Sequence, residues 1–369
     1  MTPMSVAGDP FALSLNENPF PPLPAVSAAL IQSIGAANRY PDFLPTRLRR
    51  LVADHARVPE ETVMLGAGAS GVTMQILHAM TRPGDRIVLS RPTFDGYPIF
   101  ARMARLTTVE VPLDRYGHHD LTAMARAAAS ARVVVLCRPH NPTGTLESAT
   151  DVERFLTDIP GDTIVLLDEA YREFVAPHQR LDVSELIGRF PNVVVLRTFS
   201  KAYGLAALRI GYGLAAPAPA ALLWAMQIPF GIPTSCMVAV EASYDAEAQL
   251  RQRIEQITAE RHHLQARLRS AGVYTTDSQA NFVYLPAAGR PWREIFFGTG
   301  LQVRHYPDGA VRITIGTRTS TRMVLSAVER ALSGPADARH VRTPRATVHT
   351  PGSRPVGSTA ERWPAPALG

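Results

Sequence analysis

Lysine is almost absent from this sequence. Of its 38 basic residues all but one are arginine, and the exception is Lys201. Both residue types can carry surface charge, but only lysine has an amine that can lose its proton and attack a carbonyl, because a guanidinium stays protonated at any working pH. The surviving lysine therefore predicts a Schiff-base role. An arginine-favouring genome would leave the same pattern, so the neighbouring residues have to decide between the two explanations.

Cysteine and long hydrophobic runs are scarce as well. The two cysteines, Cys137 and Cys236, are too few and too far apart for a disulfide framework or a metal cluster, and they fit a reducing compartment. No basic residue precedes Arg39, no apolar leader opens the sequence, and no run is long enough to cross a bilayer. We therefore expect a cytoplasmic protein without a metal and without a membrane partner.

Acidic residues are outnumbered, 32 against 38 basic residues, which gives a formal net charge of +6. Half of that excess lies in residues 335–369, where five arginines and six prolines accompany two acidic residues. We expect this segment to be a disordered tail rich in proline and arginine. The other basic residues form no stripe, so the sequence predicts no nucleic-acid partner.

Short apolar runs alternate with helical stretches between residues 62 and 215. The seven expected strands are Thr62–Leu65, Asp85–Leu89, Thr107–Val111, Arg132–Cys137, Thr163–Leu167, Asn192–Arg197 and Ile210–Leu214. Near-continuous apolar strands are buried on both faces of a sheet, so we expect an α/β fold with a mostly parallel seven-stranded sheet. In such sheets ligands bind beyond the carboxyl ends of the strands.

The 369 residues are enough for a large domain and a smaller one. We place an N-terminal extended arm and a first helix in residues 1–38, the large domain in 39–271, and a smaller α+β C-terminal domain in 272–334. A long charged helix over Glu247–Ala271 closes the large domain, and Gly272 ends it. The smaller domain is expected to hold strands at Ser278–Leu285, Leu301–His305 and Val311–Gly316 and a last helix through Leu332.

A glycine-rich turn, residues 66–71, matches GxGxxG between an expected strand and an expected helix. A dinucleotide site needs an acidic residue at the end of the next strand, but Asp85 stands at the start of that strand and Arg91 at its end. The dehydrogenase alternative is therefore weak. What the turn does predict is a phosphate cradle made of backbone N–H groups at a helix N-terminus.

Three polar residues follow expected strands. Asp168 closes the apolar run from Ile164, Tyr171 lies three residues later, and Asn141 lies in a turn after another strand. A cofactor with a pyridine ring needs an anion such as Asp168 to keep its ring nitrogen protonated. The other two side chains can donate hydrogen bonds to a phenolate oxygen on the same ring. A structural acid and a simple turn would explain the same residues in isolation.

Six motifs together resemble the fold-type I pyridoxal 5'-phosphate (PLP) dependent aminotransferases in order and spacing. They are Gly68-Ala69-Ser70, Arg91-Pro92-Thr93-Phe94, Asn141-Pro142-Thr143-Gly144, Asp168-Glu169-Ala170-Tyr171, Ser200-Lys201 and Arg209-Ile210-Gly211. Three longer runs, Asn38–Asp42, Asn192–Gly211 and Ser278–Val283, resemble the histidinol-phosphate and aromatic amino acid aminotransferase group, especially its actinobacterial aromatic branch. The similarity extends from Leu15 to Leu332.

The resemblance implies the PLP-transferase type I fold, PLP as cofactor, and a role for each matched residue. Lys201 would hold the cofactor as a Schiff base and then move a proton between the substrate Cα and C4', while Asp168 would pair with the pyridinium. The remaining cofactor contacts would be Asn141 and Tyr171 to the phenolate oxygen, Phe94 on the ring face, and Ala69, Ser70, Thr198, Ser200 and Arg209 to the phosphate.

The resemblance also implies how substrates and a second subunit would bind. Arg312 would clamp the α-carboxylate of an amino donor or a 2-oxo acid acceptor, a bidentate geometry that lysine cannot copy, and Asn16 would line the same site. Tyr40 would reach across a homodimer to the cofactor phosphate of the neighbouring subunit and would also help to line the substrate site. Members of the group usually carry a Pro-x-Tyr segment ahead of the arm, and Met1–Phe11 lack it.

The donor side chain therefore stays open. An aromatic or similar α-amino acid is favoured, with histidinol phosphate or a substrate of secondary metabolism as alternatives. A PLP-dependent decarboxylase of a phosphorylated amino acid would use the same scaffold. A PLP-sensing transcription regulator would need a helix-turn-helix segment ahead of the fold, where only the short arm is expected.

Overall fold

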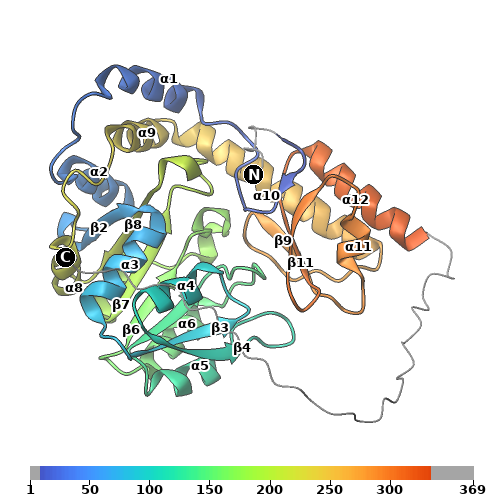
Figure 1. Cartoon of the computed structure of the whole chain (residues 1–369), viewed down its shortest axis with the longest axis horizontal. Coiled ribbons are helices and arrows are strands. Elements are labelled where there is room, and N and C mark those ends of the chain that lie inside the picture. The colour runs from blue at the N-terminus through green and yellow to red at the C-terminus, as the bar shows by residue number, and fades with distance from the viewer. Residues whose placement is uncertain (1–8, 334–369) are drawn as a thin grey trace, which may run out of the picture. The chain divides into compact units, whose positions relative to one another are not determined.

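The computed structural model describes residues 9–333, so the tail expected at 335–369 lies outside the described part of the chain. Residues 9–332 belong to one compact unit, which holds two sheets (Figure 1). The domain boundaries expected at residues 38 and 271 stay predictions. In the described range, no helix combines the length and the apolar character needed to cross a membrane.

The larger sheet has seven strands in the order β2-β8-β7-β6-β5-β3-β4. They are β2 (Val63–Ala67), β3 (Arg86–Arg91), β4 (Thr107–Pro112), β5 (Val133–Cys137), β6 (Ile164–Asp168), β7 (Val193–Thr198) and β8 (Ile210–Ala215). Every neighbouring pair is parallel except the two made by β8, which runs antiparallel to β2 and β7. The expected mostly parallel sheet of seven strands is confirmed.

Helices cover both faces of this sheet, which is why its strands are apolar throughout. In β6, Ile164 and Leu166 pack into one apolar cluster, whereas Val165 and Leu167 pack into another. The helices between strands are α3 (Gly68–Met80), α4 (Gly96–Met103), α5 (Leu121–Ala128), α6 (Ala149–Asp158), α7 (Val183–Arg189) and α8 (Pro217–Trp224). Short 3-10 turns lie at Ile34–Ala36, Glu60–Thr62, Arg172–Phe174, Pro177–Gln179 and Ala206–Leu208.

The N-terminal segment contacts both sheets. Its first element, β1 (Ala12–Leu13), pairs in parallel with β10 (Gln302–His305) of the smaller sheet, a strand that the expected extended arm did not include. Helix α1 (Pro24–Ser33) packs along α9 (Thr234–Asp245), and α2 (Thr46–Ala56) packs on β2. Figure 1 shows α1 and α9 side by side.

The long helix α10 (Glu247–Ser270) lies where it was expected and ends just before Gly272, whose φ is +71°. It leads into a smaller sheet of order β1-β10-β11-β9. The other elements of this region are β9 (Phe282–Leu285), α11 (Trp292–Phe296), β11 (Val311–Thr314) and α12 (Arg318–Ser333).

Strand β9 begins later than the expected start at Ser278. The Ser278 hydroxyl donates to the Phe282 carbonyl oxygen over 2.6 Å, and the Gln279 N–H donates to the Gly144 carbonyl oxygen over 2.7 Å. Ser278 and Gln279 therefore bond to Phe282 and to a loop of the larger sheet instead of to a neighbouring strand. This link fixes the smaller sheet against the loop that carries Asn141.

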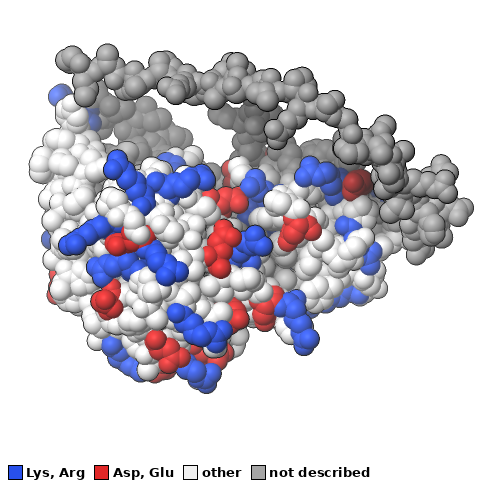
Figure 2. All heavy atoms as spheres, turned by 60° about the horizontal axis from the view of Figure 1, so that its bottom comes forward, with Lys and Arg blue, Asp and Glu red and all other residues white. Residues whose placement is uncertain are grey.

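Charges of both signs are interspersed on the face drawn in Figure 2. Several pair between elements, among them Arg189 with Glu153, and Arg91 with Glu110 at 3.7 Å. Exposed pairs of this kind add little to stability, because water and salt screen them. The main effect of these residues is a surface on which positive and negative charges alternate.

Candidate active site

The carboxyl ends of β5 and β6 bring together several residues expected to carry chemistry. Asp168 is the last residue of β6 and lies beside Cys137, the last residue of β5. Asn141 and Tyr171 lie in the loops that follow these strands, and Asn141 Nδ2 donates to the Tyr171 hydroxyl over 3.3 Å. Burial raises the pKa of Tyr171, so this hydroxyl keeps its proton at neutral pH.

Lys201 lies in the loop after β7, and its Nζ donates to the Leu15 carbonyl oxygen over 2.9 Å. Burial, and after it the positive charge of Arg312, lowers the pKa of Lys201 to about 8. A large fraction of the amine is therefore neutral in mildly alkaline solution. A lysine nucleophile requires this state.

The Asp168 carboxylate is held by two donors. Its Oδ1 accepts the Ala170 N–H over 3.0 Å, and its Oδ2 accepts the Tyr97 hydroxyl over 2.6 Å. Burial raises the pKa of Asp168, and the hydrogen bond from Tyr97 opposes that rise. Tyr97 was not identified from the sequence; its only signal was an aromatic residue three positions after Phe94.

A glycine-rich turn leads from β2 into α3. The helix starts at Gly68, whose φ is +72°, and Ala69 and Ser70 form its first turn. Strand β8 passes so close that a Cβ on Gly211 would collide with the backbone N of Ala69. The first N–H groups of a helix have no intrahelical acceptor, so those of Ala69 and Ser70 can bind an anion.

Hydroxyl groups and a guanidinium complete this anion cradle. Thr198 Oγ1 donates to Ser200 Oγ over 2.9 Å, and Arg209 Nη1 lies 3.4 Å from the same Ser200 oxygen. Arg209 also lies against Gly68, where any Cβ would collide with Nη2. Together the two hydroxyls, the guanidinium and the N–H groups suit a phosphate.

Arg312 is buried on β11 and faces the same sheet edge. Its Nη1 donates to Asn141 Oδ1 over 2.6 Å, and its Nη2 donates to the Ser14 carbonyl oxygen over 2.7 Å. Its Nε is buried and has no hydrogen-bond partner within the described residues. Buried donors are rarely left unpaired, and a ligand carboxylate matches the geometry of a guanidinium.

Asn16 ties the N-terminal segment to both sheets. Its Nδ2 donates to the Tyr171 hydroxyl over 2.9 Å, and its carbonyl oxygen accepts from Asn281 Nδ2 over 3.0 Å. Its own N–H donates to Thr314 Oγ1 over 3.0 Å. Asn16 therefore lies beside the predicted cofactor contacts and beside β11, which carries Arg312.

Phe94 and Tyr40 are exposed aromatic residues among the expected site residues. Phe94 follows β3, is 37% exposed, and meets Tyr97 edge to face at 5.8 Å. Tyr40 is 84% exposed and packs on Phe230 at 4.9 Å. Within residues 9–333 no hydrogen bond links the Tyr40 hydroxyl to the residues around Lys201, and the side chain lies exposed beside Phe230.

The comparisons with known proteins agree with this geometry. The family described as aminotransferase class I and II matches residues 9–330. The chain belongs to the class I and II aminotransferases. A relative from Streptomyces avermitilis named aromatic amino acid aminotransferase is 39% identical to this chain, and the match covers 89% of this chain and 92% of the relative. A relative of the same name from Rhodococcus opacus is 40% identical, and that match covers 82% of this chain and 85% of the relative.

A solved structure agrees with the fold of this aminotransferase. The histidinol-phosphate aminotransferase from Sinorhizobium meliloti, in complex with pyridoxal-5'-phosphate, has a TM-score of 0.81 and 26% identity, covering 87% of this chain and 90% of that one. The expected type I fold of PLP-dependent transferases is confirmed.

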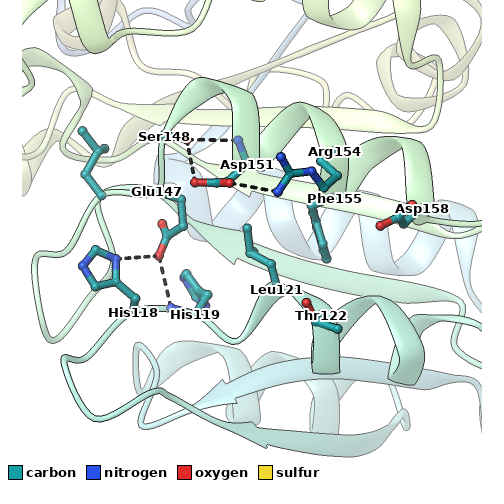
Figure 3. Close-up of a pocket in the computed structure, with 11 residues that line it drawn as sticks. His118, His119, Leu121, Thr122, Glu147, Ser148, Asp151, Arg154, Phe155 and Asp158 are labelled. Carbon is teal, nitrogen blue, oxygen red and sulfur yellow. Dashed lines mark hydrogen bonds and ion pairs between the residues drawn. The ribbon is translucent and has the colours of Figure 1, made fainter.

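A separate hollow of about 470 Å³ lies outside this cluster, between α5 and α6 (Figure 3). On its wall Glu147 Oε1 lies 3.5 Å from His118 Nδ1 and accepts the His119 N–H over 3.1 Å. The hydrogen bond that the His118 ring donates to the Glu147 carboxylate raises the pKa of His118. This pair joins loop 114–119 to loop 139–147, which carries Asn141.

Proposed function

We propose that this chain is a PLP-dependent aminotransferase that moves an amino group from an aromatic or similar α-amino acid to a 2-oxo acid. The observation that carries the proposal is the place of the only lysine, Lys201, next to the sheet edge that holds Asp168, with an amine of pKa about 8. Bound PLP supplies an electron sink for the substrate Cα. The family and the relatives' names support the assignment.

The residues present fit PLP. Lys201 would bind the cofactor covalently and afterwards carry a proton at Nζ, and Asp168, oriented by Tyr97, would face the pyridine nitrogen. Asn141 and Tyr171 would donate to the ring oxygen. The phosphate would lie in the cradle of Ala69, Ser70, Thr198, Ser200 and Arg209, with Phe94 on the ring face and Tyr40 contributed by a second copy of the chain.

The substrate carboxylate would bind Arg312, whose buried Nε has an unused proton to donate. Asn16 would lie beside it. The donor side chain would meet an aromatic wall, because the buried Tyr306 packs on Tyr284, the register partner of Arg312. Aromatic rings pack well on such surfaces, which favours an aromatic donor.

Histidinol phosphate is the second candidate donor, and the similarity to the Sinorhizobium meliloti structure favours it. That donor presents a phosphate instead of an α-carboxylate, so Arg312 would bind a different group. A substrate of secondary metabolism would keep the carboxylate contact. A decarboxylase would release carbon dioxide, which product analysis detects.

The test is a half-reaction assay of the purified protein against phenylalanine, tyrosine, histidine and histidinol phosphate. The absorbance of the cofactor reports each conversion. We expect phenylalanine or tyrosine to convert the cofactor with the highest kcat/KM and to yield the 2-oxo acid. A far higher kcat/KM for histidinol phosphate would make the second candidate correct. Carbon dioxide release without 2-oxo acid would rule out transamination.

A further inference from the structure

A second arginine lies beside Arg312 on the wall of the site. Strands β10 and β11 are antiparallel, and Arg304 is the register partner of Arg312. Directly opposed residues on two strands point to the same face of a sheet. Tyr284 of β9 opposes Arg312 on its other side, so Tyr284, Arg312 and Arg304 form one row.

Tyr306 shows that this row reaches the loop after β3. The Tyr306 ring centre lies 5.8 Å from that of Tyr284. The Arg304 guanidinium carbon lies 6.0 Å from the centre of the Tyr306 ring. The two arginines, the tyrosine and Asp95 therefore share one neighbourhood.

Arg304 already forms an ion pair with Asp95. The contact joins Arg304 Nη2 and Asp95 Oδ2, and the two side chains are 45% and 59% exposed respectively. Asp95 directly follows Phe94, so the pair connects the loop after β3 to the smaller sheet. Because both groups still reach water, a ligand charge could compete for Arg304.

We propose that Asp95 determines how much negative charge the site accepts on the substrate side chain. Arg312 remains available for one carboxylate, whereas the charge of Arg304 is neutralised. A second anionic group, such as a distal carboxylate or a phosphate, has to compete with Asp95 for Arg304 and lies close to a like charge. A neutral aromatic side chain meets neither obstacle. This inference rests on the proposed function, because it assumes that Arg312 binds the substrate carboxylate.

The test uses two ligands without an amine, so that no reaction follows binding. They are 3-phenylpropionate and 3-(4-carboxyphenyl)propionate, which differ by one carboxylate. Calorimetry on the PLP-loaded full-length protein gives the ratio of their Kd values in the wild type and in Asp95→Asn. We expect the variant to shift this ratio in favour of the dianion by about tenfold, from the lost repulsion and the freed Arg304.

Two further variants isolate the cause. Glu110→Gln removes the same charge from the neighbouring strand β4, where Glu110 pairs with Arg91, and it should change the ratio by less than about twofold. Adding Arg304→Gln to Asp95→Asn should abolish the gain. An unchanged ratio in Asp95→Asn, an equal gain in Glu110→Gln, or a gain that survives loss of Arg304 would each overturn the inference.

Turnover of phenylalanine in the same preparations separates the two claims. If phenylalanine is transaminated while the Kd ratio does not respond to Asp95→Asn, the charge assignment is wrong and the proposed function stands. If phenylalanine is transaminated but 3-phenylpropionate does not bind, the inference alone is overturned. If no α-amino acid converts the cofactor, the proposed function is wrong and this inference fails with it.

Discussion

Asp168 is a buried carboxylate with a raised pKa. Its buried negative charge lowers the stability of the fold, whereas the proposed reaction needs that charge beside the pyridine nitrogen. An acid whose folded pKa exceeds its unfolded value loses stability as pH rises from the unfolded pKa through the folded one. The empty protein at neutral pH therefore contains a destabilising charge. A neutral side chain of the same shape would remove it.

Asp168→Asn should accordingly bind PLP but lose turnover by about 100-fold or more, because an amide cannot keep the ring nitrogen protonated. The same variant, freed of PLP, should melt at a higher temperature than the wild type at pH 7, and the difference should shrink toward pH 4. Half-reaction kinetics and thermal melts measure the two effects. Turnover near the wild-type value would show that Asp168 is structural.

The pKa of Lys201 predicts stability that increases with pH, the opposite of the trend for Asp168. Its folded pKa of about 8 lies below the ordinary lysine value, so the folded state favours the neutral amine, and stability is gained as pH rises from the folded pKa to the unfolded one. The rate of PLP capture by the cofactor-free protein should rise with pH and level off above a midpoint of about 8. Stopped-flow absorbance measures this rate. A midpoint near the ordinary lysine value would contradict the burial of this amine.

Local motifs made part of the site predictable from the sequence. Asp168 and Asn141 follow buried strands, and the strand pattern alone puts such residues at one sheet edge. Tyr97 could not be predicted in the same way, because its bond to Asp168 depends on how α4 packs on the sheet. The bond from Arg312 to the Ser14 carbonyl likewise joins residues from opposite ends of the chain.

At the scale of elements, the larger sheet was predictable because its strands are continuous apolar runs. Strand β1 was not, because two residues, Ala12 and Leu13, carry no periodic signal and pair with a strand at the other end of the chain. The start of β9 was misplaced for a related reason, since the Ser278 hydroxyl bonds to Phe282 and the Gln279 N–H bonds to a distant loop.

The pair of His118 and Glu147 joins two loops, and its contribution should depend on pH. The raised pKa of His118 gives stability that is present below the unfolded value and lost as pH rises through the folded pKa. Burial raises the pKa of Glu147, but His119, His118 and a backbone N–H lower it more, so its contribution is lost in acid. The pair should therefore stabilise most between about pH 4.5 and 6.5.

His118→Gln should lower the melting temperature most near pH 6 and least near pH 8.5. Thermal melts of the variant and the wild type across this range measure the difference. His178→Gln changes an exposed histidine and serves as the control. A loss that does not vary with pH would mean that His118 acts by packing alone.

At the scale of the molecule, exposed apolar side chains gather around Tyr40. Phe43 and Phe230 meet edge to face at 5.2 Å, and both remain more than a third exposed. Exposed aromatic clusters of this kind mark interaction surfaces. We predict a homodimer that buries them and brings Tyr40 of one copy to the phosphate cradle of the other.

Sedimentation of the PLP-loaded protein should give twice the chain mass of 40.1 kDa. Tyr40→Phe should keep the dimer and weaken PLP binding by about 10- to 100-fold, the usual loss for one hydrogen bond to a charged group. A monomer with full activity would contradict this assignment of Tyr40.

The central claim, that Lys201 holds PLP covalently, can be tested directly because the chain contains no second lysine. Borohydride reduction of the PLP-loaded protein, followed by peptide mapping, fixes the label where it was bound. We predict one pyridoxyl group per chain, on the peptide that contains Lys201, and none in a Lys201→Ala variant. A reduced protein without label on that peptide would contradict the account.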